Sequence, residues 1–172
     1  MIVLNKIKKQ SDTLYNYILS LSRSKILYIK FNLSDTFENR VHLIFIHFSF
    51  ICIKVKSDDK KTFKKFYQNM FNLIFNKIEI DMRESGFGDT TINKNMRFLV
   101  KIFYKILLEI EKYSKMSLEE KNGFLYKYLS QNPLKKSIKN NEIAMYFNKY
   151  EAFCFDLSPD SVLKGQLNFN YN

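Results

Sequence analysis

Four carboxylates surround a pair of glycines near the middle of the chain, and paired carboxylates are groups that carry out general acid–base catalysis. The glycines are Gly86 and Gly88, and the carboxylates are Glu79, Asp81, Glu84 and Asp89. Catalysis requires two of these groups to converge on one proton, which their spacing in the sequence does not establish. We expect no catalytic residue here. Arg83, Glu84 and Asp89 are either solvated or in contact with a partner.

The same glycines also admit a phosphate-binding interpretation, because Gly86-Phe87-Gly88 comes just before a helical pattern. A dinucleotide-binding loop follows a β-strand, whereas the residues before Gly86 have the spacing of a long helix. Glycine readily adopts the left-handed conformation that ends helices, so a turn between two helices explains Gly86, and Gly88 allows a second change of direction. We therefore predict a structural hinge at Gly86 and Gly88.

The remaining residues that often carry chemistry are isolated in the sequence. His42 and His47 are five residues apart and point in different directions on a helix, so we expect them to be hydrogen-bonded core residues rather than a metal pair. Cys52 and Cys154 are far apart, which favours buried, inert thiols in a reducing compartment. The chain carries no metalloprotease, serine hydrolase or Walker motif. We predict no cofactor, no metal and no enzymatic activity.

Two amphipathic helices position the hinge. Before it, apolar residues recur on one helical face between residues 59 and 85. They are Phe63, Tyr67, Met70, Ile74 and Ile78. After it, a second apolar seam consists of Ile92, Met96, Leu99, Phe103, Ile106, Ile110 and Tyr113. Asp89, Thr90 or Thr91 can cap this second helix. We predict an antiparallel helical hairpin.

A positive stripe runs beside the second seam. It consists of Lys94, Arg97, Lys101 and Lys105, whose spacings of three and four place them in one sector of the helix. The chain has a formal net charge of +11, so ribosomal RNA, an anionic membrane or an acidic protein would be attracted to it. The stripe is either a solvated face or a partner surface, and the lysines between positions 54 and 65 leave the same alternatives open.

The rest of the chain also favours helices, because only four glycines and two prolines are available for turns. We predict helices at residues 11–29, with a cap at Ser11-Asp12, and at 37–55, 117–129 and 141–156. The apolar segment 37–55 is interrupted by Lys54 too early to cross a bilayer, so we expect a buried helix, with a central strand as the alternative. The tail, residues 165–172, is either a docked strand or frayed.

Together these patterns predict an all-α fold. We expect a single compact helical domain, residues 1–172, of about five or six helices around the central antiparallel hairpin, with 1–10 and 166–172 peripheral. The amino-terminal sequence lacks the apolar region of a secretory signal, so we expect the protein to stay in the compartment where it is made.

The chain resembles the ubiquinol-cytochrome c chaperone family, the helical assembly factors for cytochrome b. The most specific match is Arg83-Glu84-x-Gly86-x-Gly88-Asp89 in its helix–turn–helix context. Further matching positions are Leu14-Tyr15, Ser22-Arg23, Asp35-Thr36, Arg40, His47, Phe66-Tyr67, Asp81-Met82, Lys94, Met96 and Phe103-Tyr104. The resemblance extends from Leu14 to about Phe169. The chain departs from the family at Lys105-Ile106, where relatives usually continue with Gly-Arg.

The resemblance implies a non-enzymatic chaperone that binds nascent cytochrome b. Its implied partners also include the ribosome, a small co-chaperone subunit and an anionic membrane, but not DNA. It implies a cytoplasmic location, peripheral to the inner face of a bacterial inner membrane. We expect partner contacts at the hinge charges and at the positive stripe. The alternatives are a basic RNA- or ribosome-binding module without a cytochrome b client, and a small-molecule enzyme.

Overall fold

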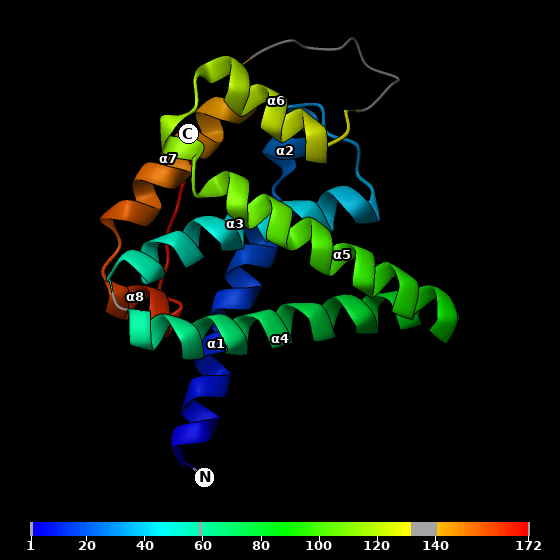
Figure 1. Cartoon of the computed structure of the whole chain (residues 1–172), viewed down its shortest axis with the longest axis vertical. Helices are drawn as coiled ribbons and strands as arrows, with labels where there is room; N and C mark the ends of the chain where they lie inside the picture. Colours follow the sequence, from blue (N-terminus) through cyan, green and yellow to red (C-terminus); the bar gives the residue numbers. More distant parts are fainter. Residues whose placement is uncertain (1, 59, 132–140, 172) are drawn as a thin grey trace.

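The computed structural model describes residues 2–58, 60–131 and 141–171 (Figure 1). Within these ranges, the six helices of eleven residues or more are α1 (Ile2–Ser22), α3 (Phe37–Asp58), α4 (Lys60–Glu84), α5 (Asp89–Ile110), α6 (Leu118–Tyr128) and α7 (Glu142–Asp156). The short elements are α2 (Lys25–Ile29), the 3₁₀ turn η1 (Tyr113–Lys115) and α8 (Pro159–Lys164). The described residues form no β-strand, so the predicted all-α fold is confirmed.

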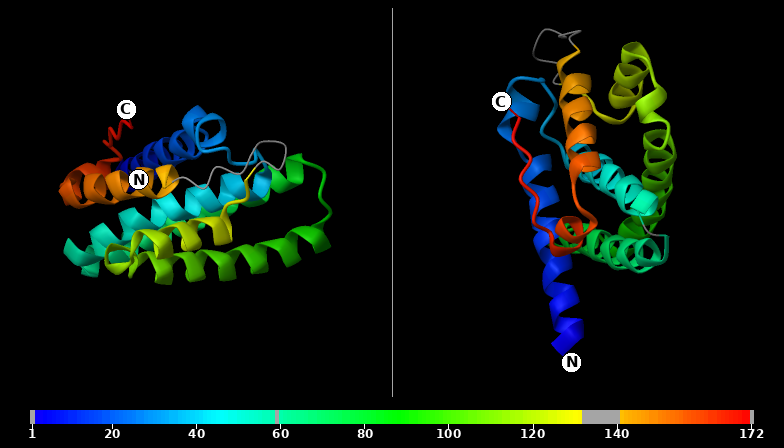
Figure 2. Two further views of the ribbon diagram at one scale, coloured as in Figure 1. Left: turned by 90° about the horizontal axis from the view of Figure 1, so that it is seen from above. Right: turned by 90° about the vertical axis from the view of Figure 1, so that its left-hand side faces the viewer.

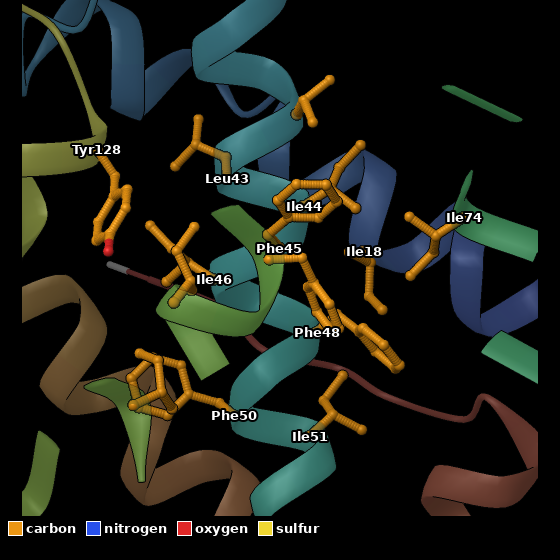
Figure 3. Close-up of a cluster of buried hydrophobic side chains, with 14 of the residues drawn as sticks. Ile18, Leu43, Ile44, Phe45, Ile46, Phe48, Phe50, Ile51, Ile74 and Tyr128 are labelled. Atoms are coloured by element: carbon orange, nitrogen blue, oxygen red, sulfur yellow. The ribbon is translucent and has the colours of Figure 1, made fainter. Parts of the chain in front are cut away.

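Helix α3, rather than the predicted hairpin, forms the centre of the core. Every residue from Val41 to Cys52 is buried, as expected for a helix that is apolar on nearly every side. Helices α1, α4, α5, α7 and α8 pack against it. Figure 3 shows its side chains directed towards Ile18 of α1, Ile74 of α4 and Tyr128 of α6. Among the described residues, no helix meets the length and hydropathy that a membrane span requires.

The beginning of the fold differs from the sequence-based prediction. Ser11 and Asp12 lie inside α1, which already begins at Ile2, so the predicted cap and the single helix 11–29 are wrong. Two side-chain hydrogen bonds stabilise the break after α1, one from within α1 and one from α2. The Ser22 hydroxyl donates to the Leu19 carbonyl at 2.9 Å, and the Tyr28 hydroxyl donates to the Ser22 carbonyl at 2.6 Å. The bond from Tyr28 satisfies the Ser22 carbonyl, which a continuing helix would use, whereas the Leu19 carbonyl also accepts from the Arg23 amide at 3.1 Å.

Helices α4 and α5 form the predicted antiparallel hairpin, which turns at Gly86 (Figure 1). Gly86 has φ +84°, the left-handed conformation expected of it. Its amide donates to the Arg83 carbonyl, and the Phe87 amide donates to the Met82 carbonyl, which is the hydrogen-bond pattern of a Schellman C-cap.

Gly88 has φ −73° and ψ 154°, an extended conformation open to any residue. It is the N-cap of α5, and its carbonyl accepts from the Ile92 amide. The predicted cap at Asp89, Thr90 or Thr91 is therefore wrong. The helix starts one residue earlier because the extended backbone of Gly88 already supplies the N-cap geometry, and the charge of Asp89 in the first turn complements the helix dipole.

The same substitution at both glycines should separate these roles. We expect Gly86→Ser to cost about 1–2 kcal/mol of folding free energy, because serine is disfavoured at positive φ. Gly88→Ser should change it by less than about 0.5 kcal/mol, since serine is a good N-cap and nothing lies within 4 Å of an added Cβ. Urea unfolding measures both. Equal midpoints for the two variants would show that Gly86 need not be left-handed.

The carboxy-terminal third follows the prediction. Ser117 and Glu120 form the expected capping box of α6, and α7 lies close to the predicted bounds. After α8 the chain runs back beside α1 towards α2 (Figure 2, right). The Phe169 amide donates to the Tyr17 hydroxyl, and Tyr171 packs against Tyr146. The described tail is thus docked in an extended form without strand pairing. The peripheral role expected for residues 1–10 and 166–172 stays a prediction.

Candidate functional site

The charges at the hinge form an exposed ion-pair network. Arg83 donates to Glu79 at 2.9 Å and also pairs with Asp89, and these carboxylates raise the pKa of the arginine. Glu84 is exposed beside them. Glu79 and Asp89 both face the guanidinium, so the arginine occupies the space in which two carboxylates would have to share a proton. Exposed pairs of this kind contribute little to the stability of a fold, because water screens them.

The four cations of the predicted stripe are exposed on α5. Within the described part of the chain, Lys94, Arg97, Lys101 and Lys105 make no ion pair with a carboxylate. Their charges are therefore available to a partner, and they add up along one side of the helix.

Three large apolar side chains share this side of α5, and sequence reasoning missed their role. Phe98 is 55% exposed, Tyr104 is 46% exposed and Leu108 is 60% exposed. At about 100° per residue, they fall in the same angular sector as the cations. We call the seven residues the α5 outer face: Lys94, Arg97, Phe98, Lys101, Tyr104, Lys105 and Leu108. The available signal was that Phe98 and Leu108 are apolar but lie outside the buried seam.

The α5 outer face combines two kinds of recognition. Its cations attract polyanions, and its exposed apolar groups are stabilised when a partner removes them from water. Large apolar side chains that cluster on a surface mark interaction sites more often than scattered ones do. The arrangement therefore fits binding of a macromolecule, and it offers no nucleophile or acid–base pair.

A second basic surface lies where α1, α2 and α3 meet. It is lined by Arg23, Lys25, Tyr28, Ile29, Asp35 and Arg40. Arg40 donates two hydrogen bonds to the carboxylate of Asp35, at 2.6 and 2.8 Å, which lowers the pKa of that carboxyl. Several positions that carry the family resemblance lie here, yet the bidentate pair holds Asp35 and Arg40 to each other. We interpret this pair as a connection between the α2–α3 loop and α3.

The histidines and cysteines are core residues, as predicted. The His42 Nδ1 lies 2.7 Å from the Tyr128 carbonyl, and the two ring nitrogens of His47 bond the Leu43 carbonyl and the Tyr146 hydroxyl. Both thiols are free and buried. Burial raises the pKa of Cys154 to about 12, which keeps this thiol protonated and unreactive at neutral pH. The described residues contain no group of His, Cys, Asp or Glu that could hold a metal ion.

Comparisons with known proteins bear on the family and the fold of the chain. A family model described as ubiquinol-cytochrome C chaperone matches residues 30–169. Among solved structures, the crystal structure of the Cbp3 homolog from Brucella abortus is similar, with a TM-score of 0.77 over 99% of this chain and 97% of that chain. Its sequence identity of 18% makes this a likeness of fold. Comparison with curated protein sequences gives no match.

Proposed function

Because the chain belongs to the ubiquinol-cytochrome C chaperone family, we propose that it is a non-enzymatic assembly chaperone for ubiquinol-cytochrome c reductase with newly synthesised cytochrome b as its client. The observation that carries this proposal is the family match over residues 30–169. The α5 outer face supports it, because a chaperone for an apolar client needs exposed apolar side chains on a stable helical domain.

We assign partner contact to the α5 outer face and to the adjoining hinge charges. Phe98, Tyr104 and Leu108 contact the client, while the cations hold the chain near an anionic surface, either ribosomal RNA or the inner face of a bacterial inner membrane. Arg83, Glu84 and Asp89 extend the charged region at the turn. Since Arg83 already pairs with Asp89, we expect these hinge residues to contribute less than the unpaired cations.

The experiment that tests the client assignment is a pull-down of the tagged chain from cells that are translating cytochrome b. The wild-type chain should retain cytochrome b above the level of an unrelated basic helical protein. Retention at the background level would reject cytochrome b as the client.

The triple charge reversal Lys94→Glu, Arg97→Glu and Lys101→Glu tests the surface. We expect binding to ribosomes or to phosphatidylglycerol vesicles to weaken at least about tenfold, since each cation near an anionic surface contributes about 1 kcal/mol. Co-sedimentation measures this binding. Reversal of the exposed Lys9, Lys77 and Lys115 changes the net charge equally and serves as the control. Unchanged co-sedimentation of the α5 variant, or an equal loss in the control, would contradict the assignment.

A basic RNA-binding module is the second candidate function. The α5 outer face supports it, because aromatic side chains between cations can stack on unpaired bases. With four phosphate contacts, binding to naked single-stranded RNA should weaken with salt at a logarithmic slope of about −3. Such a slope, together with no retention of cytochrome b, would favour this alternative.

A further inference from the structure

An apolar socket lies at the open end of the hairpin, where the carboxy-terminal part of α3 meets α4 and α5. It is lined by Cys52, Ile53, Phe63, Tyr67, Tyr104 and Leu107, with Lys56 and Glu111 as its charged members. Its volume is about 180 Å³. Pockets that enclose drug-sized ligands measure about 300–1,000 Å³. The α5 socket, as we call it, therefore fits one side chain of a partner better than a small-molecule substrate.

Ring packing holds the walls of the socket in place. Tyr67 packs against Phe63 with ring centroids 5.5 Å apart, and Tyr104 packs against Phe71 at 6.2 Å and Phe103 at 5.7 Å. Lys56 and Glu111 pair with each other, so they add no net charge. Burial, followed by a side-chain interaction with Tyr104, raises the pKa of the Tyr67 hydroxyl, so these two tyrosines meet in the wall of the socket.

The surface next to the socket is positive. Tyr104 belongs both to the socket wall and to the α5 outer face, and the exposed Lys101 and Lys105 come three residues before it and one residue after it. The carboxylate of Glu109, also on α5, is bound by Lys127 at 2.6 Å and by the Tyr128 hydroxyl at 2.7 Å. A partner approaching along α5 therefore meets cations whose charge is not balanced by carboxylates of the same face.

We propose that the α5 socket and the α5 outer face together bind one amphipathic helix of a protein partner, with an apolar side chain inserted in the socket and carboxylates facing Arg97, Lys101 and Lys105. The unpaired cations favour an acidic segment of the partner, and the concave apolar socket favours an apolar side chain on that segment. Helices bind to grooves in this way through anchors spaced three, four or seven residues apart. The inference rests on the proposed function and specifies which element of the client is recognised. The client helix then competes with the anionic surface for the same three cations.

Fluorescence anisotropy with a labelled helical peptide tests this mode of binding. The peptide carries Phe and Leu anchors at helical spacing with Glu beside them, and a matched peptide has Lys in place of Glu. We expect the wild-type chain to bind the acidic peptide at least about tenfold more tightly than the basic one. Ile53→Trp, which fills the socket, and Tyr104→Ala, which removes its wall, should each weaken binding of the acidic peptide at least about tenfold.

Met145→Ala is the matched control, because Met145 is a large apolar side chain, 50% exposed, on α7. It should leave the affinity unchanged. Urea unfolding of each variant shows whether it is folded, and Tyr104→Ala remains informative if Ile53→Trp is unstable, since Tyr104 is half exposed. Equal affinities for wild type, Ile53→Trp and Tyr104→Ala would overturn the proposal, as would equal binding of the acidic and basic peptides.

Vesicle binding distinguishes a bound helix from a flat membrane contact. The pull-down distinguishes failure of the socket from failure of the client assignment. Binding to phosphatidylglycerol vesicles without peptide binding, retained in Ile53→Trp and lost in Lys101→Glu, would overturn the proposal in favour of a flat anionic membrane. In the cytochrome b pull-down, equal retention by wild type and Ile53→Trp would overturn the socket while the proposed function stands. If wild type retains no cytochrome b, the proposed function fails, and the peptide titration still decides whether the socket binds an acidic helix.

Discussion

Gly165→Ala is expected to destabilise the domain by about 3 kcal/mol, because the position combines a left-handed backbone with a close approach of α1. Gly165 ends α8 with φ +68°. A Cβ added there would lie 2.8 Å from the backbone nitrogen of Leu14 and 3.2 Å from the Gln10 carbonyl oxygen. These atoms belong to the helical backbone of α1, so relief requires the two helices to separate. Urea unfolding followed by circular dichroism measures the loss.

Gly123→Ala is the control for this prediction. Gly123 lies inside α6, and an added Cβ there would meet nothing within 4 Å. Alanine has the higher helix propensity, so we expect this variant to be more stable by about 0.5–1 kcal/mol. A decrease in unfolding free energy for Gly165→Ala and an increase for Gly123→Ala would confirm that the loss comes from the close packing of α8 on α1. A loss below about 1 kcal/mol for Gly165→Ala would show that this contact can relax.

Acidification from pH 7.5 to 5.0 is expected to lower the unfolding free energy through His47 by about 2 kcal/mol. His47 is fully buried, and burial lowers its pKa to about 4. Its Nδ1 lies 2.7 Å from the Leu43 carbonyl, which can only accept, so a neutral ring donates from Nδ1 and accepts from the Tyr146 hydroxyl at Nε2.

The sign follows from proton binding in the two states. Between the unfolded pKa of about 6.5 and the folded pKa, the unfolded chain binds a proton on this ring and the folded chain does not. The stability contribution is therefore present above about pH 6.5 and is lost as the pH falls towards 4. Most carboxylates remain ionised at pH 5.0, which limits their share of the change.

Urea unfolding of wild type and His47→Gln at both pH values isolates this effect. The variant should be less stable at pH 7.5 and should lose about 2 kcal/mol less on acidification. Comparing the two chains cancels the opposing contribution of Glu151, whose pKa burial raises. Parallel pH profiles for the two proteins would show that His47 is not held neutral in the fold.

The spacing of apolar residues predicted the long helices well, because apolar side chains repeat on the side of each helix that packs against its neighbours. The repeats through α4 and α5 and the continuous apolar run of α3 all have this origin. Helix ends were predicted less well. The break after Ser22 depends on the Tyr28 hydroxyl, and the start of α5 depends on the backbone at Gly88. Several neighbouring residues can act as the cap of a helix, so the presence of one capping side chain does not identify the residue at which the helix begins or ends.

The candidate site was predicted in part. The four cations of α5 were identified from their spacing, since positions three and four apart share a helical face. Phe98 and Leu108 were missed, because an apolar residue outside the seam can be covered by another helix or left exposed. Both are more than half exposed in the described part of the chain. The pairing of Arg83 with Glu79 and Asp89 likewise depends on how the turn folds.

By itself, the sequence determined the helical class, the turn at Gly86 and the direction in which each α5 side chain points from its own axis. These properties depend on local backbone geometry and on residues a few positions apart. The tertiary structure alone decided that α3 is central, that the tail packs beside Tyr17, and that Ile53, Phe63 and Tyr104 form one socket. Such contacts join segments far apart in the chain, and their formation depends on how whole helices pack against one another.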